Sequence, residues 1–183
     1  KSEEPAKVRI ETIDGPATPP LAETQNIAAA LTRSTAFVQG TAKLFIDWAE
    51  TFRSNNLNTL DTVDQTMFFK AGGDAMIYYL HGYWDIPAGK ALKIKTSIPD
   101  CEGWNFQLNN IWMESLDYRY HDIHVNNASA KLDDDGGVTI IVGERDPGIG
   151  NWLDTAGHTR GTMLLRWTGA NEHPVPTCEV IDL

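Results

Sequence analysis

The sequence predicts a mainly β protein of the α+β class, in which an N-terminal helical pair precedes an antiparallel sandwich or barrel. Two observations support this prediction. Before about residue 60 apolar side chains recur at helical spacing, and after it short aromatic and β-branched runs alternate with turn residues. A chain of 183 residues corresponds to about one domain at ~150 residues each, enough for a core without disulfides or metal. We place the boundary so that 1–60 is the preface, packed on the sandwich, and 61–183 is the β part.

The preface opens with a short alternating segment, 8–13, which the Asp14-Gly15-Pro16 turn ends, so a strand is expected there. Thr18 followed by two prolines is typical of a helix start. An apolar stripe with spacings of four and three then follows: Val38, Ala42, Phe45, Ala49 and Phe52. Because Gly40 interrupts the beginning of this stripe, we predict two helices, over 19–32 and 34–53.

The β part is predicted from segments that are rich in aromatic and β-branched residues. They cover 67–69, 76–84, 91–98, 104–113, 138–142, 162–167 and 177–181. Glycine, proline and aspartate clusters separate them, including Gly72-Gly73-Asp74 and Asp133–Gly137. Many short strands at this spacing favour an antiparallel sandwich or barrel.

Charge excludes several classes of partner. The formal net charge is −10, and residues 61–183 account for −9 of it, with nine basic and eighteen acidic side chains. Such a domain lacks the clustered cations that nucleic-acid binding needs, and it repels anionic membranes. No apolar run approaches the ~18 residues that span a bilayer. We therefore expect no nucleic-acid partner and no membrane partner.

The cysteines and the first residue leave the compartment open. Cys101 and Cys178 lie 77 positions apart and match no zinc or redox spacing, so free thiols are favoured over a disulfide. The chain begins with Lys1, as a processed product or the C-terminal part of a longer protein would. A bacterial cytoplasmic location and a periplasmic or secreted one both remain possible.

The segment 104–112 predicts a binding face. Trp104, Phe106, Leu108 and Trp112 are expected on one face, which is core by default, and three amides, Asn105, Gln107 and Asn109, on the other. Amides beside aromatic side chains such as Tyr118 suit hydroxyl-rich or amide-bearing ligands. The alternative is a solvated outer face of the sandwich.

Two further motifs predict no metal site. His121 and His124 are three apart, which places them on opposite faces of a strand, and no third ligand follows at a recognised spacing. Asp133–Gly137 lacks the ligand spacing of a calcium loop and is interpreted as a polar hairpin tip. No cofactor is predicted, because no dinucleotide or phosphate-loop motif occurs.

The long segment 146–158 is interpreted as an irregular loop that carries candidate site residues. Asp154 and His158 are the catalytic candidates, as an acid–base pair in which the carboxylate orients the imidazole. Asn151, Trp152 and, on the next strand, Arg166 are candidates for ligand binding, with Arg145 or Arg166 as an anion clamp. No nucleophile elbow occurs, and hydrogen bonds that hold the loop in place are the alternative role.

These residues also carry a resemblance. Asn151-Trp152-Leu153-Asp154-Thr155 is its most distinctive part, and about residues 30–183 contribute. The other matching positions are Gly72-Gly73-Asp74, 104–112, 116–119, Asn126, Asp146-Pro147-Gly148, Gly157-His158, Gly161 and Arg166-Trp167. Together they resemble a bacterial family of domains of unknown function, often the C-terminal half of longer proteins. The resemblance implies a jelly-roll-like β-sandwich and no established activity, substrate or cofactor.

Three functions follow as hypotheses. The first is an accessory β-sandwich that binds a small polar or carbohydrate-like ligand through aromatic and amide side chains. The second is an enzyme, a hydrolase or lyase, that uses Asp154 and His158 with an arginine clamp. The third is a structural or assembly module that packs against an upstream domain or a second copy of the chain.

Overall fold

The computed structural model describes residues 7–11, 13–16, 18 and 21–183, and it confirms a mainly β protein with one long helix near the N-terminus. The chain divides into two compact units, with the boundary after Gly40. In the first unit, residues 7–11 and 13 form no regular structure, so the strand predicted over 8–13 is wrong for its described residues. Thr12, Pro19 and Pro20 lie outside the described residues.

A single helix, α1 (Thr24–Asn55), replaces the two predicted helices. Gly40 does not break it, because one glycine costs an established helix only about 1 kcal/mol, less than a second nucleation. A Cβ atom at Gly40 would meet nothing within 4 Å, so no packing requires the glycine. Of the predicted stripe, Ala49 and Phe52 near the C-terminal end of α1 are buried, whereas Val38, Ala42 and Phe45 are exposed.

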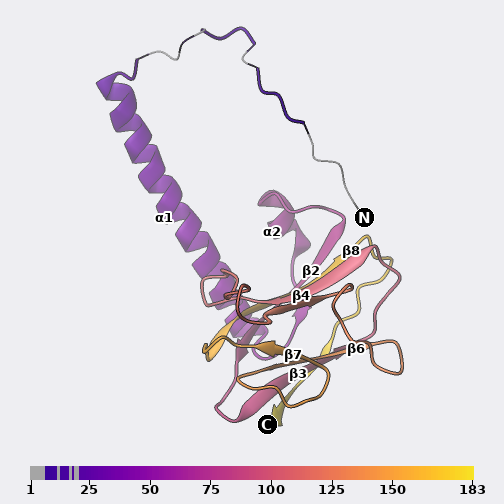
Figure 1. Cartoon of the computed structure of the whole chain (residues 1–183). Coiled ribbons are helices and arrows are strands. Elements are labelled where there is room, and N and C mark those ends of the chain that lie inside the picture. Colours follow the sequence, from indigo (N-terminus) through magenta and orange to yellow (C-terminus); the bar gives the residue numbers. More distant parts are fainter. Residues whose placement is uncertain (1–6, 12, 17, 19–20) are drawn as a thin grey trace. The chain divides into compact units, whose positions relative to one another are not determined.

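The second unit is a sandwich of two sheets, which lie one above the other in Figure 1. The five-stranded sheet has the order β1 (Asp61–Thr62), β2 (Ile77–Asp85), β8 (Arg160–Thr168), β4 (Gly103–Leu108) and β5 (His124–Asn126), all antiparallel. The four-stranded sheet has the order β7 (Asn151–Asp154), β6 (Val138–Gly143), β3 (Lys90–Thr96) and β9 (Thr177–Asp182). Its β6–β7 pair is parallel, so the sandwich is not purely antiparallel as predicted.

Three predicted segments differ from the observed elements. Residues 67–69 lie in a short helix, α2 (Gln65–Lys70), whose N-cap Asp64 accepts a hydrogen bond from the Thr66 N–H at 3.0 Å. The run 104–113 is a strand only as far as Leu108 and then turns, so Trp112, which was expected on the core face, is exposed. The loop predicted over 146–158 contains β7, a four-residue edge strand too short to show a periodic pattern.

The core lies between the two sheets and is built from the inward-facing side of every long strand. Its largest fully buried side chains are Trp84, Trp167 and Phe106. Trp84 Nε1 donates to the Thr162 carbonyl at 3.1 Å, and Trp167 Nε1 donates to the Pro174 carbonyl at 3.2 Å. Each indole therefore keeps a hydrogen bond despite full burial.

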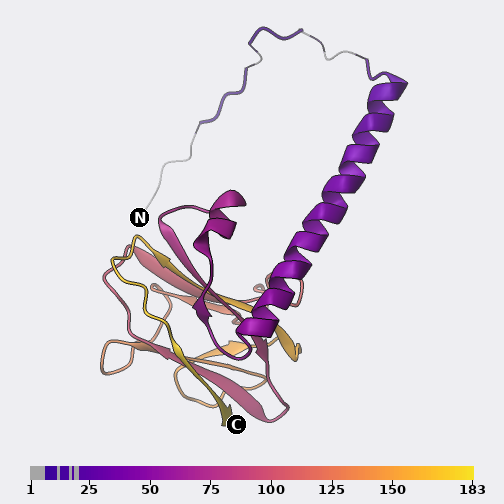
Figure 2. The same cartoon turned by 180° about the vertical axis from the view of Figure 1, so that it is seen from behind.

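A second, smaller cluster covers part of the outer face of the five-stranded sheet. Phe52 from α1 and Phe68 from α2 pack on Tyr83 of β2. Figure 2 shows α2 and the last turns of α1 on this side of the sheet, away from β3 and β9. The cluster fixes how the end of α1 meets the sandwich and leaves β8, β4 and β5 outside its footprint.

Two further observations concern the cysteines and the length and character of the helices. Cys101 and Cys178 are free and half-buried, and burial raises the pKa of both thiols. Within the described residues, no helix combines the length and the apolar character needed to cross a membrane.

Candidate functional site

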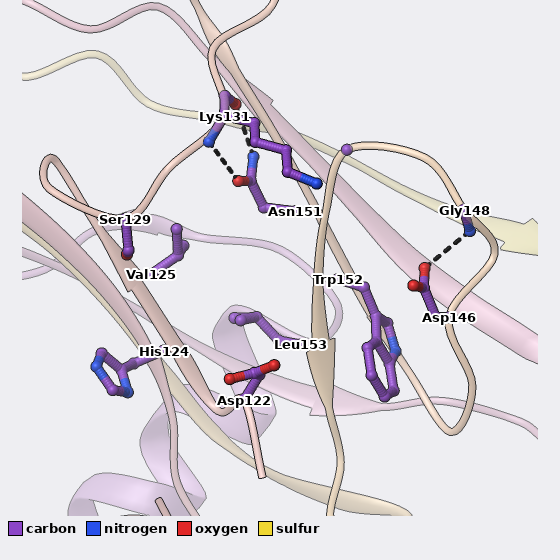
Figure 3. Close-up of a pocket in the computed structure, with 11 residues that line it drawn as sticks. Asp122, His124, Val125, Ser129, Lys131, Asp146, Gly148, Asn151, Trp152 and Leu153 are labelled. Atoms are coloured by element: carbon purple, nitrogen blue, oxygen red, sulfur yellow. Dashed lines mark hydrogen bonds between the residues drawn. The ribbon is translucent and has the colours of Figure 1, made fainter.

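A cavity of about 360 Å³ opens at one edge of the sandwich, where β5 and β7 are the outermost strands of their sheets (Figure 3). Its wall is mainly polar and includes one large aromatic side chain. The side chains that give it this character are Asp122, His124, Ser129, Lys131, Asp146 and Trp152. Sequence analysis predicted Trp152 and its neighbour Asn151 as binding residues, and both line this cavity.

Asn151 holds the cavity wall together rather than presenting a free amide. Its Oδ1 accepts the main-chain N–H of Lys131 at 2.7 Å, and its Nδ2 donates to the carbonyls of Lys131 at 2.9 Å and Thr139 at 2.8 Å. These bonds, drawn in part in Figure 3, tie the segment before β6 to β7. Both N–H donors are therefore used by the fold, as in the structural alternative considered for this loop.

Trp152 is fixed at the rim of the same cavity. Leu153 points into the sandwich core, so Trp152 projects from the other face of β7. Its Nε1 donates to the Gly143 carbonyl at 3.0 Å, which sets the orientation of the indole. Figure 3 shows the ring beside the Asp146–Gly148 turn, where Asp146 Oδ1 accepts the Gly148 N–H at 2.8 Å.

The edge of β7 itself contributes main-chain groups. The Asp154 N–H donates across this edge to the Asp122 carbonyl at 2.7 Å. Successive residues of a strand direct their N–H and C=O groups to alternate edges, so the main-chain groups of Trp152 point the same way as those of Asp154. A ligand at this edge thus meets an N–H, a C=O and an indole from one residue.

Charged and polar side chains surround that edge. Figure 3 places Asp122, His124 and Ser129 on one side of β7, with Trp152 and Asp146 on the other. In the part of the chain that the structure describes, the side chains of Asp122, His124 and Lys131 form no hydrogen bond or ion pair with protein groups. Donors and acceptors are therefore both available, without a dominant charge.

The structure does not bring together the two catalytic candidates. Asp154 Oδ2 lies 2.7 Å from Nδ1 of His121, and its Oδ1 accepts the Ala156 N–H at 2.9 Å. His158 is exposed, and its main-chain N–H bonds to the Thr155 carbonyl. Asp154 therefore orients His121 instead of His158. No local pattern indicates this partner, because the two residues lie 33 positions apart and meet only through the fold.

The predicted amide row does lie on one face. On β4, Trp104, Phe106 and Leu108 are buried, while Asn105 and Gln107 lie on the outer side, as the alternation predicted. Asn109 is buried, and its Oδ1 accepts a hydrogen bond from Gln107 Nε2 at 2.7 Å.

Arg166 joins this face, because it pairs in register with Asn105 across β8 and β4. Tyr118 lies in an exposed turn. The anion clamp predicted beside the catalytic pair is not formed. β8 begins at Arg160, two positions after His158, and Arg166 lies six residues further along the strand, about 20 Å at ~3.3 Å per residue. Arg145 donates to the Leu183 carbonyl at 3.2 Å.

Within the described residues, no group of three or more His, Cys, Asp or Glu side chains is placed to hold a metal ion. Asp133–Gly137 forms a turn in which the Gly136 N–H bonds to the Asp133 carbonyl at 2.9 Å, as expected of a polar hairpin tip. Lys95 forms ion pairs with Asp133 at 3.7 Å and Asp135 at 3.0 Å. One lysine thus offsets part of the negative charge of this turn.

Comparisons with known proteins bear on the fold more than on the chemistry. A solved structure of an uncharacterised protein from Burkholderia cenocepacia is similar to this chain, with 47% sequence identity and a TM-score of 0.87. The match covers 93% of this chain and 47% of that one, so the chain spans about half the length of its neighbour. A protein from Vibrio parahaemolyticus aligns over 91% of this chain and 48% of its own, with 14% identity and a TM-score of 0.48. No family model matches the chain, and no curated protein matches it.

Proposed function

We propose that this chain is an accessory β-sandwich module that binds a small, hydroxyl-rich, carbohydrate-like ligand in the cavity between β5 and β7. The observation that carries the proposal is the placement of Trp152 at the rim of a polar cavity of about 360 Å³. This volume lies within the range of small-molecule sites, about 300–1,000 Å³. The indole supplies the apolar surface on which the C–H face of a sugar ring packs.

The polar groups around Trp152 are suited to the hydroxyl groups of such a ligand. A sugar hydroxyl donates one hydrogen bond and accepts others, so it needs both carboxylate acceptors and N–H or ammonium donors. Asp122 and Asp146 supply the acceptors, and Lys131 and the main-chain N–H of Trp152 supply donors. Asn151 acts at one remove, because its three bonds hold β7 against the segment that carries Lys131.

The proposal extends to the type of sandwich and to its family. We propose a jelly-roll-like arrangement. It is supported by two strand pairs in opposite sheets, because β2 pairs with β8 in one sheet and β3 pairs with β6 in the other. In the four-stranded sheet, β7 and β9 take the outer positions. Membership of the bacterial family of domains of unknown function remains a prediction from the Asn151–Thr155 segment.

An enzymatic function is the second candidate, and the His121–Asp154 pair is the observation that favours it. The carboxylate at 2.7 Å from Nδ1 orients the ring and leaves Nε2 as the base or acid, the arrangement used in general acid–base catalysis. Replacing His121 by Gln would abolish turnover of any substrate and leave binding at Trp152 intact.

A thermal-shift screen with neutral mono- and oligosaccharides tests the binding proposal. We expect at least one sugar at about ten times its Kd to stabilise the protein by ~1.4 kcal/mol, a rise in Tm of roughly 3–5 °C. The variants Asp122→Ala and Lys131→Ala should lose this rise, because neither side chain supports the fold. Lys70→Ala, at the end of α2, is the matched control and should retain it. Equal shifts in all four proteins would place the ligand elsewhere.

A further inference from the structure

The outer face of the five-stranded sheet carries a row of nitrogen donors away from the cavity described above. Arg166 on β8 pairs in register with Asn105 on β4, and Asn105 pairs with Asn126 on β5. The residues that alternate with them, Leu165, Trp167, Phe106 and Val125, are buried in the core. All three polar side chains therefore project outward. At ~4.8 Å between neighbouring strands, the row is about 10 Å long.

Arg166 is a half-buried cation without a partner. Among the residues that the structure describes, no carboxylate lies within 4.0 Å of its guanidinium, and no side-chain hydrogen bond reaches it. Burial lowers the pKa of Arg166, and the opposing influence comes from Tyr79 rather than from a carboxylate. Partly buried arginines are normally paired, because desolvation of an unpaired charge is costly. In a chain of net charge −10, this unpaired cation is unexpected.

The two amides also have donors to spare. Asn126 Oδ1 accepts the N–H groups of Ala128 at 2.8 Å and Ser129 at 3.2 Å, which leaves its NH₂ group free to donate. The Asn105 amide forms no hydrogen bond with any described residue. The row thus offers a guanidinium fork and then two amide donors.

Among the described residues, the neighbours of the row on β2 carry no negative charge. Tyr79 pairs in register with Arg166, and His81 lies on the neighbouring diagonal of β2. The His81 ring stacks on Phe52 at 4.4 Å and on Phe68 at 4.8 Å, and its buried Nδ1 has no hydrogen-bond partner. Burial, and to a smaller extent the charge of Arg166, lowers the pKa of His81 to about 3 and so keeps this imidazole neutral. None of these described neighbours supplies a counter-charge, so the guanidinium of Arg166 is open to an anionic ligand.

We propose that the Arg166–Asn105–Asn126 row is a second binding site, which takes a carboxylate-bearing, hydroxyl-rich small molecule of the sugar-acid class. The planar guanidinium binds the carboxylate through two parallel N–H···O bonds. Asn105 and Asn126 donate to hydroxyl oxygens further along the ligand, and an extended six-carbon chain with oxygens at both ends reaches most of the way along the ~10 Å row. One positive charge complements a monoanion.

The two matched probes are sodium gluconate and sorbitol, which share a six-carbon polyol chain and differ in the carboxylate. Tm is measured at 20 mM of each, with NaCl added to equal ionic strength. We expect gluconate to raise Tm by about 3 °C and sorbitol to leave it unchanged. Arg166→Gln should abolish the rise, and Arg166→Lys, which keeps the charge but loses the fork, should weaken binding at least fivefold. Arg33→Gln, an exposed arginine of α1, is the control.

A second measurement needs no variant. In ¹H–¹⁵N spectra of the wild-type protein, gluconate should shift the side-chain amide signals of Asn105 and Asn126 with one saturation curve. The absence of these shifts, or an unchanged Tm response in Arg166→Gln, would overturn the proposal. A response to inorganic phosphate but not to gluconate would overturn the carboxylate assignment.

This site and the cavity at Trp152 can be separated by experiment. Asp122→Ala should leave the gluconate response intact, and Arg166→Gln should leave any neutral-sugar response intact. A gluconate response that disappears in Asp122→Ala instead would assign the anion to the β5–β7 cavity and refute the row.

Discussion

His81 shows how a single buried side chain makes stability depend on pH. Its ring is enclosed between Phe52 and Phe68, and its Nδ1 lacks a partner. Burial first, and the charge of Arg166 second, lower its pKa to about 3, against about 6.5 in an unfolded chain. Between these values the unfolded state binds a proton that the folded state does not. Stability contributed by neutral His81 is therefore complete above pH ~6.5 and is lost as pH falls toward 3.

Replacing His81 by Phe should flatten this dependence, because the ring stack is kept and the titrating group is removed. From pH 6.5 to 4.5 we expect the free energy of unfolding to fall about 1–3 kcal/mol less in His81→Phe than in the wild type. Urea unfolding at several pH values measures the slope, and the exposed His158→Gln provides the control. Parallel curves for His81→Phe and the wild type would show that folding does not lower the pKa of His81.

The face of a strand on which a side chain lies could be predicted from the sequence more reliably than the residue to which that side chain bonds. The alternation on 104–108 correctly assigned Trp104, Phe106 and Leu108 to the core, since one buried face forces a period of two. The partner of Asp154 was missed because a hydrogen bond between residues 33 positions apart depends on how β7 meets the loop at His121. A local pattern contains no information on such a contact.

Among the elements, α1 and β7 depart furthest from expectation, for opposite reasons. Gly40 was given too much weight as a helix breaker, although its place in a continuous 32-residue helix costs little. β7 was missed because four residues, paired in parallel with β6 at a sheet edge, show no usable period. The helix α2 was hidden by its Met67-Phe68-Phe69 run, and its signal was the N-cap Asp64.

Gly161 on β8 and Gly40 on α1 have different surroundings, so replacing each by alanine should change stability in opposite directions. Gly161 lies where β8 passes close to the chain at Asn109, and a Cβ atom there would be 2.1 Å from the Asn109 carbonyl oxygen. Because that neighbour is main chain, Gly161→Ala should destabilise the sandwich by about 2–4 kcal/mol. Gly40→Ala meets no atom and should stabilise α1 by about 0.5–1 kcal/mol. Chemical denaturation followed by circular dichroism compares the two, and a neutral Gly161→Ala would mean that β8 moves freely there.

Part of the acidic excess of the chain is paired with basic side chains in the folded protein. Asp133 and Asp135 pair with Lys95, and Asp117 pairs with Arg119 at 3.0 Å. The acidic side chains at the cavity edge, Asp122 and Asp146, are instead available to a ligand. Trp152 can be predicted from the sequence as a candidate for ligand binding, whereas the cavity around it depends on how β5 and β7 meet at the open edge of the sandwich.

Binding of a hydroxyl-rich ligand in the cavity at Trp152 would change the surroundings of the Trp152 indole N–H. Its signal in ¹H–¹⁵N spectra, assigned by its loss in Trp152→Phe, can be followed while neutral oligosaccharides are added to ~10 mM. We expect at least one sugar to shift this signal together with the main-chain signals of Lys131 and Asn151, along one saturation curve. An unchanged Trp152 signal across the whole series, or saturable shifts confined to other parts of the protein, would contradict it.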